Sequence, residues 1–218
     1  MAHERLLLLS NQLRPAEDRN FSSQTKVIPL DHNWVFKQKG GTHSETTFRS
    51  TAMFPTDIHV DLLAHNLIPD PFTGMSEKEV QWIDDKTWIY RTNFTVPHTE
   101  VTQFQSVALV FEGLDTFATV KMDGSEILRS DNMFISHRVD VRRLLKHKAD
   151  HILEIAFKSA TEMGQLEMKK NPGHAWGTWN GDTSRAAVRK AQYHYVSFPD
   201  DVDFMAELIE PIGLGLGT

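Results

Sequence analysis

The strongest constraint on the fold is an alternation of side-chain polarity between residues 88 and 157. Residues 88–96 follow a period of two, and residues 116–122 and 151–157 repeat it. Such a period places successive side chains on opposite faces of a β-strand. The continuous apolar run 107–111 suits a central strand. Strands at this spacing, without long helices between them, favour an antiparallel β-sandwich over an α/β fold.

Turn and cap signals place the shorter elements. Asp123-Gly124 lies between two strand-like runs and predicts a hairpin. Thr56 or Asp57 is a candidate N-cap, and Ser76 opens a helix in the style of a capping box. The further expected elements are strands at 34–36 and within 133–141, and helices within 55–63, at 76–79, within 141–148 and at 161–170.

The length indicates one domain with appendages. The chain has 218 residues, whereas a (β/α)8 barrel needs about 250. Residues 1–27 show no sustained period and are expected to be a flexible lead, so the folded domain should run over 28–195. Residues 196–218 contain five acids and no Lys or Arg. We interpret this composition break as an acidic, glycine-rich tail that is not native domain sequence.

Composition excludes several classes of function. The formal net charge is −6 and the chain has no cysteine, which argues against nucleic-acid binding, a disulfide scaffold and a thiol nucleophile. No apolar run has the length of a signal h-region or a membrane span, so we expect a cytoplasmic protein without membrane contact. His137, His174 and His194 lack metal-ligand spacing. No metal or cofactor is therefore predicted.

A loop dense in aromatic and polar residues is the first candidate for ligand binding. Trp176 and Trp179 could stack on the apolar face of a sugar, and Asn180 and Asp182 could bind its hydroxyl groups. The alternative is that these residues close one end of the sandwich or contact another domain.

The residues that follow this loop are the second candidate. Arg189, Gln192, Tyr193 and His194 could orient a substrate or a domain interface, or they could form a structural network of buried polar groups. As a further alternative, Arg185 and Arg189 could pair with Asp182 across a turn.

Two further acids lie near the starts of expected strands. Asp115 and Asp131 could form a carboxylate pair, although turn and capping roles are commoner for such residues.

Four blocks of the sequence carry a family resemblance, at residues 82–91, 111–124, 131–138 and 182–194. Together they resemble the N-terminal sugar-binding domain of the β-mannosidases of glycoside hydrolase family 2, most closely the non-secreted fungal type. The resemblance covers residues 28–195 and implies a jelly-roll-like, galactose-binding-domain-like sandwich. It also implies a longer parent enzyme, in which two glutamates on a barrel hydrolyse terminal β-mannosides with retention.

The sequence departs from that family in two places. The family's acid/base lies in an Asn-Glu pair, and no such dipeptide occurs here. The family continues with Gly-Trp-Asp-Trp-Gly-Pro, whereas Val196-Ser197-Phe198 follows Tyr195. We therefore assign no catalytic residue, and a frameshift or misread splice junction would explain the altered tail.

Three hypotheses for function follow. The first is a truncated β-mannosidase that acts on β-mannoside glycans only within the full-length enzyme. The second is a stand-alone, lectin-like module that binds sugar through Trp176 and Trp179. The third is a non-catalytic interaction domain that self-associates through the face that would dock on the barrel. Assays of turnover, sugar binding and light scattering distinguish them.

Overall fold

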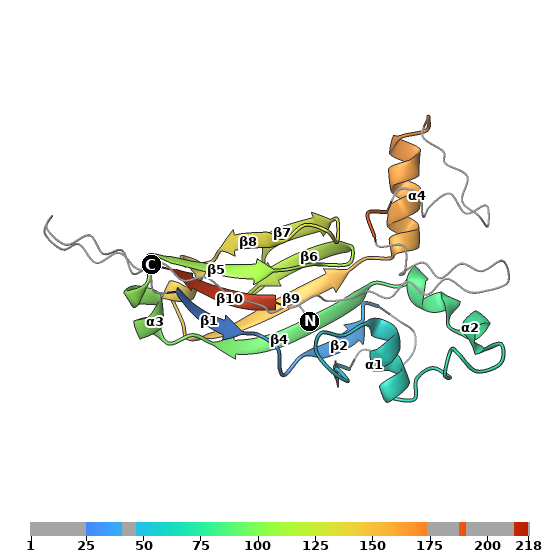
Figure 1. The fold of residues 1–218 in the computed structure, drawn as a ribbon, viewed down its shortest axis with the longest axis horizontal. Coiled ribbons are helices and arrows are strands. Elements are labelled where there is room, and N and C mark those ends of the chain that lie inside the picture. Colours follow the sequence, from blue (N-terminus) through green and yellow to red (C-terminus); the bar gives the residue numbers. More distant parts are fainter. Residues whose placement is uncertain (1–24, 41–46, 174–187, 191–211, 218) are drawn as a thin grey trace, which may run out of the picture.

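The fold is built from two antiparallel β-sheets (Figure 1). The computed structural model describes residues 25–40, 47–173, 188–190 and 212–217. A six-stranded sheet has the order β3-β2-β4-β9-β6-β7, and a four-stranded sheet has the order β1-β10-β5-β8. The strands are β1 (Thr25–Pro29), β2 (Val35–Gln38), β3 (Arg49–Ser50), β4 (Trp88–Thr95), β5 (Ser106–Phe111), β6 (Phe117–Met122), β7 (Ser125–Asp131), β8 (His137–Asp140), β9 (Asp150–Phe157) and β10 (Ile212–Gly217). The predicted antiparallel sandwich is confirmed.

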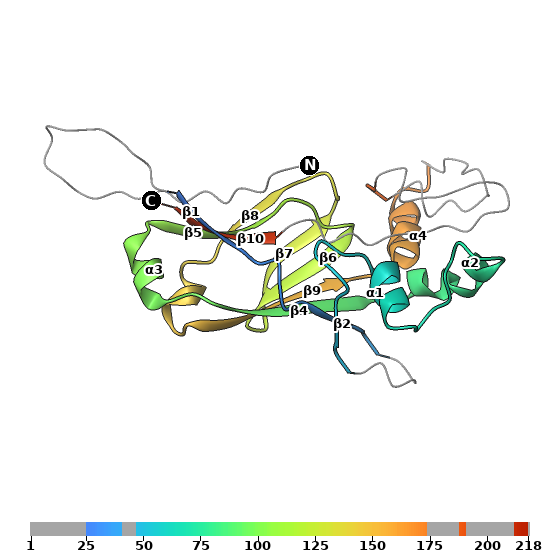
Figure 2. The same ribbon diagram turned by 60° about the horizontal axis from the view of Figure 1, so that its bottom comes forward.

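Short helices lie at the two ends of the sandwich (Figures 1 and 2). One end carries α3, and the other end carries α1, α2 and α4. The helices are α1 (Ile58–Ala64), α2 (Ser76–Glu79), α3 (His98–Gln103) and α4 (Ala160–Lys170), with 3-10 turns η1 (Gln81–Asp85) and η2 (Leu144–Lys146). None of the helices in the described ranges is long and apolar enough to cross a membrane.

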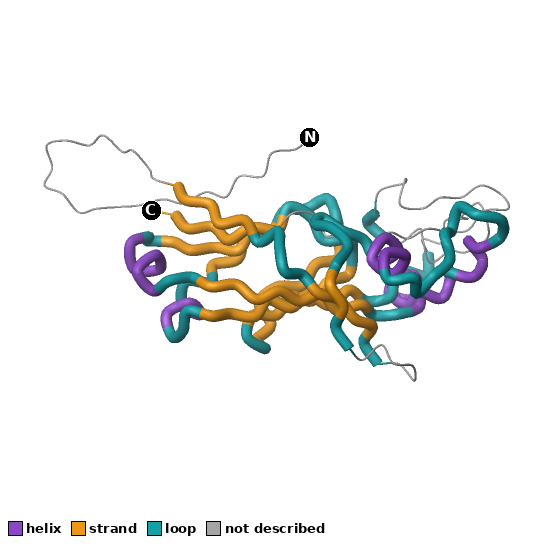
Figure 3. Tube along the Cα trace, turned by 90° about the horizontal axis from the view of Figure 1, so that it is seen from below, coloured by secondary structure: helices purple, strands orange, loops and turns teal. Residues whose placement is uncertain are grey.

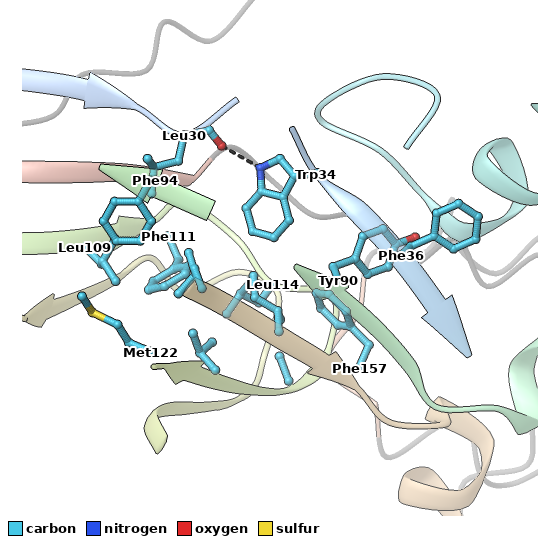
Figure 4. Close-up of a cluster of buried hydrophobic side chains, with 14 of the residues drawn as sticks. Leu30, Trp34, Phe36, Tyr90, Phe94, Leu109, Phe111, Leu114, Met122 and Phe157 are labelled. Atoms are coloured by element: carbon cyan, nitrogen blue, oxygen red, sulfur yellow. Dashed lines mark hydrogen bonds between the residues drawn. The ribbon is translucent and has the colours of Figure 1, made fainter. Parts of the chain in front are cut away.

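The core lies between the sheets, and strand periodicity supplies it. In β4 the side chains of Trp88, Tyr90, Thr92 and Phe94 are buried, while Asn93 is exposed. Residues from both sheets meet in one apolar cluster (Figure 4). Figure 3 shows the two layers of strands from below. The alternation of polarity in the sequence thus identifies the inward face correctly.

The predicted hairpin joins β6 to β7. Asp123 and Gly124 have φ angles of 52° and 83°. Two positive φ angles are what a two-residue type I′ turn requires, and Asp-Gly tolerates them at low cost. The Asp123 carboxylate also accepts bonds from the Lys148 side chain and the Ile152 amide, at 2.8 and 3.0 Å. The turn is therefore tied to β9 as well as to its own strands.

The two predicted helix caps have different outcomes. Asp57 caps α1, because its Oδ1 accepts from the amides of His59 and Val60 at 2.9 and 3.0 Å. The capping-box prediction for Ser76 is wrong. Ser76 is the first residue inside α2, and Met75 at the cap position makes no side-chain cap bond. Ser76 thus stands one position beyond the N-cap, where a capping box would need it.

Two strands extend into segments that the sequence analysis placed outside the folded domain. Thr25, Lys26 and Val27 belong to β1, so this strand begins before residue 28. Residues 212–217 form β10, which pairs with β1 on one side and β5 on the other. Its Gly-Leu alternation has little intrinsic strand preference, so the backbone partners on both sides account for the strand.

Candidate functional site

Most of the residues predicted to bind sugar lie outside the described ranges. These are Trp176, Trp179, Asn180, Asp182, Gln192, Tyr193 and His194. Arg189 is described, within the three-residue segment Val188-Arg189-Lys190. This segment lies near the base of α4, at the end of the sandwich that also carries α1 (Figure 1).

Arg189 points outward and pairs with a carboxylate of β7. Its Nη1 lies 3.2 Å from Oδ1 of Asp131, and both side chains are more than half exposed. The backbone of the segment is attached at the same place, because the Met133 amide donates to the Arg189 carbonyl at 3.1 Å and Asn132 forms a parallel bridge with Arg189. An exposed ion pair of this kind adds little stability. Arg189 is thus placed on the surface beside the β7–β8 connection.

Lys190 points inward, and the sequence analysis did not single it out. Its Nζ lies 2.8 Å from Oδ2 of Asp115, and neither side chain is exposed. The Thr116 hydroxyl also donates to the Asp115 carboxylate. Asp115 and Asp131 therefore have separate cations, Lys190 and Arg189. A lysine between Arg189 and Ala191 carries no local signal of burial.

A second buried polar group lies on α1. The Asp61 carboxylate accepts from the Ala52 amide at 2.6 Å and from the Tyr90 hydroxyl at 3.1 Å. Burial raises the pKa of Asp61 to about 6, although hydrogen bonds from Ala52, Thr56 and Tyr90 act to lower it. The carboxyl group is therefore a structural acceptor for β4 and for the loop before α1.

His59, on the same helix, is nearly buried. Burial lowers the pKa of His59 to about 4, with Asp57 acting to raise it and Lys190 lowering it further. The influence of Lys190 places the cation of the 188–190 segment within electrostatic reach of α1.

Most of the sandwich matches the model of a known protein family. Residues 34–197 match the model of the glycosyl hydrolase 2 galactose-binding domain-like family. This chain belongs to the glycosyl hydrolase 2 galactose-binding domain-like family. The family resemblance found in the sequence is confirmed.

Curated relatives of this galactose-binding-like domain are fungal enzymes. The chain is 48% identical over 169 residues to the β-mannosidase B of Thermothelomyces thermophilus. The match covers 78% of this chain and 19% of that protein. It is 44% identical over 167 residues to the β-mannosidase B of Aspergillus oryzae, covering 77% and 19%. The chain spans about a fifth of the length of the curated relatives it matches.

Solved structures give the same picture. The β-D-mannosidase of Dictyoglomus thermophilum superposes with a TM-score of 0.74 at 31% identity, over 88% of this chain and 22% of that one. A further structure, that of the exo-β-D-glucosaminidase CsxA, has a TM-score of 0.53 at 16% identity over 87% of this chain and 20% of that one. The second likeness concerns the fold alone.

The two buried acids of the described domain, Asp61 and Asp115, are bonded to other residues of the domain. Retaining glycosidases need two carboxyl groups about 5–5.5 Å apart on either side of the scissile bond. Asp61 and Asp115 are fully buried, and each is bonded to groups of the domain itself. Neither can reach a sugar. Among the described residues, no group of three His, Asp or Glu could hold a metal ion.

Proposed function

We propose that this chain is the N-terminal, sugar-binding portion of a β-mannosidase, an enzyme that removes terminal non-reducing β-D-mannose from glycans. The observation that carries the proposal is the 48% identity to a β-mannosidase B over 169 residues. The likeness to a solved β-D-mannosidase at 31% identity supports it. In this proposal the sandwich contributes to substrate binding, and the carboxyl groups that perform the chemistry lie elsewhere in the enzyme.

The 218-residue chain should therefore show no hydrolysis alone. Incubation with an aryl β-mannoside is expected to release no more aglycone than a boiled sample of the same chain. A full-length β-mannosidase B assayed beside it confirms that the substrate and conditions are adequate. Turnover well above the boiled sample would contradict the proposal, because the proposal places the catalytic carboxyl groups elsewhere in the enzyme.

A chimera tests the positive half of the proposal. In the Thermothelomyces thermophilus enzyme, the part that matches residues 34–190 is replaced by those residues of this chain. We expect the chimera to hydrolyse the aryl β-mannoside. The matched control extends the replacement to residue 218, which removes the Gly-Trp-Asp-Trp-Gly-Pro segment that the family resemblance implies, and should be inactive. A folded but inactive first chimera would contradict the assignment.

A stand-alone carbohydrate-binding module is the second candidate. Trp34 and Trp88 are 2% and 1% exposed, so neither ring can stack on a sugar. Trp82 packs against the core. The proposed sugar platform is therefore Trp176 and Trp179, with the partly buried Trp82 as the comparison. Isothermal titration with mannose and β-manno-oligosaccharides tests it: binding that Trp179→Ala abolishes and Trp82→Phe preserves supports the module.

Self-association is the third candidate, and exposed aromatic side chains favour it. Phe72 and Phe134 are 90% and 65% exposed, and large exposed apolar groups often mark interaction surfaces. Light scattering over a concentration series tests this, and a monodisperse monomer at high concentration would contradict it. The cytoplasmic location stays a prediction, which fractionation of the source cells tests.

A further inference from the structure

The ion pair between Lys190 and Asp115 is the least expected feature of the described sandwich. The Nζ to Oδ2 distance is 2.8 Å, and both side chains are fully buried. Lysine and aspartate are almost never fully buried unless they are paired. Removing two charges from water is costly, and apolar side chains of similar size often give equal or greater stability. Stability alone therefore does not account for this pair.

The pair connects parts of the chain that are distant in sequence. Asp115 lies in the connection from β5 to β6, four residues after Phe111. Lys190 lies in the 188–190 segment, whose backbone is bonded to Met133 beyond the end of β7. The pKa of His59 on α1 also responds to Lys190. The ion pair and these backbone bonds thus join the β5–β6 connection, the β7–β8 connection and the 188–190 segment.

The 188–190 segment shows the alternation of an extended chain. Val188 and Lys190 are buried, and Arg189 between them is exposed. A slip of two residues would keep the same faces inward and outward. It would bring neutral Val188 or Gln192 to the position of Lys190 and move the Lys190 ammonium away from the Asp115 carboxylate. The backbone bonds to residues 132 and 133 do not discriminate between these registers, whereas the ion pair does.

Strand β10 begins at the same end of β5. Ile212, the first residue of β10, pairs with Phe111, the last residue of β5. Residues 190 and 212 are therefore both attached close to the 111–115 connection. The described ends of the two segments, Lys190 and Ile212, are thus anchored through Asp115 and Phe111.

We propose that Lys190 is a positioning residue, whose buried ion pair with Asp115 fixes the register of the 188–190 segment on the sandwich. Gln192, Tyr193 and His194 follow within four residues. Their contact with sugar rests on the proposed function, but the register does not. The pair thereby places the start of the segment that was predicted to meet substrate.

Amide hydrogen exchange on the 218-residue chain, followed by NMR, tests the register. The Met133 amide reports locally, because it donates to the Arg189 carbonyl. The amide of Ile155, a fully buried residue of β9, reports on the whole domain. The variants are Asp115→Asn, which removes the carboxylate charge beside Lys190, and the double variant Asp115→Leu with Lys190→Met, which replaces both charges by apolar groups. Arg189→Gln, which removes the exposed pair beside them, is the matched control.

The double variant should keep its urea midpoint and its Ile155 protection, while exchange at Met133 becomes at least about tenfold faster through local opening. Arg189→Gln should change Met133 exchange less than about twofold, because exposed pairs contribute little. Unchanged Met133 protection in the double variant would overturn the proposal. Equal acceleration at Met133 and Ile155 would also overturn it, because the pair would then act only on global stability. If Asp115→Asn does not fold, the double variant decides.

Sugar titration of the same proteins separates this inference from the proposed function. If the unaltered chain binds β-manno-oligosaccharides, the double variant should bind them roughly tenfold more weakly, because the contacting residues are displaced. If the unaltered chain binds no sugar, the proposed sugar contact fails, and Met133 exchange still decides whether Lys190 sets the register.

Discussion

Individual buried residues of α1 carry opposite responses to pH. Asp61 has its pKa raised from 3.8 to about 6 by burial, so it favours the folded state most at low pH and this contribution is lost as the pH rises through 6. His59 has its pKa lowered from 6.5 to about 4, so its contribution is present above pH 6.5 and is lost as the pH falls toward 4. Between pH 4 and 6, Asp61 makes the free energy of unfolding fall with pH, and His59 makes it rise.

Replacing Asp61 should reveal the pH dependence of stability that His59 contributes. In Asp61→Asn, the free energy of unfolding is expected to rise with pH between 4 and 6.5, with a slope of up to about 1.4 kcal/mol per pH unit. The unaltered chain should show a flatter profile over the same range. Urea denaturation at several pH values measures this. Glu79→Gln, at an exposed position of α2, is the control and should leave the profile unchanged. A flat profile in Asp61→Asn would contradict the burial argument.

At the scale of elements, helix ends and turns depend on single side chains that satisfy backbone groups. The Asp57 carboxylate caps α1, whereas Ser76 in α2 makes no cap bond. The β6–β7 turn has its own anchor in Asp123, whose Oδ2 lies 2.7 Å from Nδ1 of the buried His151. These residues hold short elements at defined places on the sandwich.

The two candidate caps should differ in their effect on stability. Asp57→Ala is expected to lower the free energy of unfolding by about 1 kcal/mol, since two amides of α1 lose their acceptor. Asp57→Asn should retain most of the stability, because the amide oxygen can still accept. Ser76→Ala serves as the matched comparison and should change little. Urea denaturation at neutral pH compares the three variants, and equal losses for Asp57→Ala and Ser76→Ala would contradict the assignment of the cap.

The turn anchor makes a separate prediction. Burial acts to raise the pKa of Asp123, but bonds from Lys148, His151 and the Ile152 amide outweigh it, and the pKa is lowered overall. Its stabilising effect is therefore present above the unfolded pKa of about 3.9 and is lost as the pH falls.

Asp123→Asn keeps a residue that tolerates positive φ but removes the charge, and should cost about 1–2 kcal/mol at pH 7. Thermal or urea unfolding checks this. Glu126→Gln, which breaks the exposed pair with Arg129, should have almost no effect.

For the whole molecule, the apolar cluster between the sheets holds the fold together. Phe111 belongs to the four-stranded sheet, is fully buried, and packs within the cluster shared with Tyr90 and Phe157 of the other sheet. Contacts between distant segments therefore depend on a few large side chains (Figure 4).

Truncation of one such side chain should weaken both sheets together. Phe111→Ala is expected to lower the free energy of unfolding by about 3–5 kcal/mol, from lost apolar burial plus the cavity left behind. The control Phe134→Ala, at a side chain that is 65% exposed, should change it by less than about 0.5 kcal/mol. Urea denaturation followed by far-UV circular dichroism measures both. A small effect of Phe111→Ala would mean that the sheets are not stabilised through this cluster.

The hypothesis of a divergent tail also belongs to the whole molecule and stays a prediction. Residues 212–217 form β10 and complete the four-stranded sheet, so a strand there is compatible with the fold whatever its origin. Sequencing of the transcript across codon 195 tests the hypothesis. An uninterrupted native reading frame through residue 218 would contradict it, and another frame encoding Gly-Trp-Asp-Trp-Gly-Pro would support it.

The sequence by itself determined the central strands β4, β5, β6 and β9, the Asp123-Gly124 hairpin and the family, and it narrowed the cap of α1 to Thr56 or Asp57. Each of these is a local pattern: a period of two, a dipeptide that tolerates positive φ, a carboxylate before a helix, or a run of matching residues. Such signals act over a few neighbouring residues, and the chain carries them in every conformation.

Only the tertiary structure decided which distant residues meet. The burial of Lys190 against Asp115, the pairing of Arg189 with Asp131, and the place of β10 between β1 and β5 have no local signature. A lysine becomes a buried residue only when the fold brings a carboxylate to it and excludes water from both. A Gly-Leu alternation forms a strand here because β1 and β5 supply backbone hydrogen-bond partners, one on each side. These features arise from contacts across the sandwich, and therefore could not be predicted from local pattern.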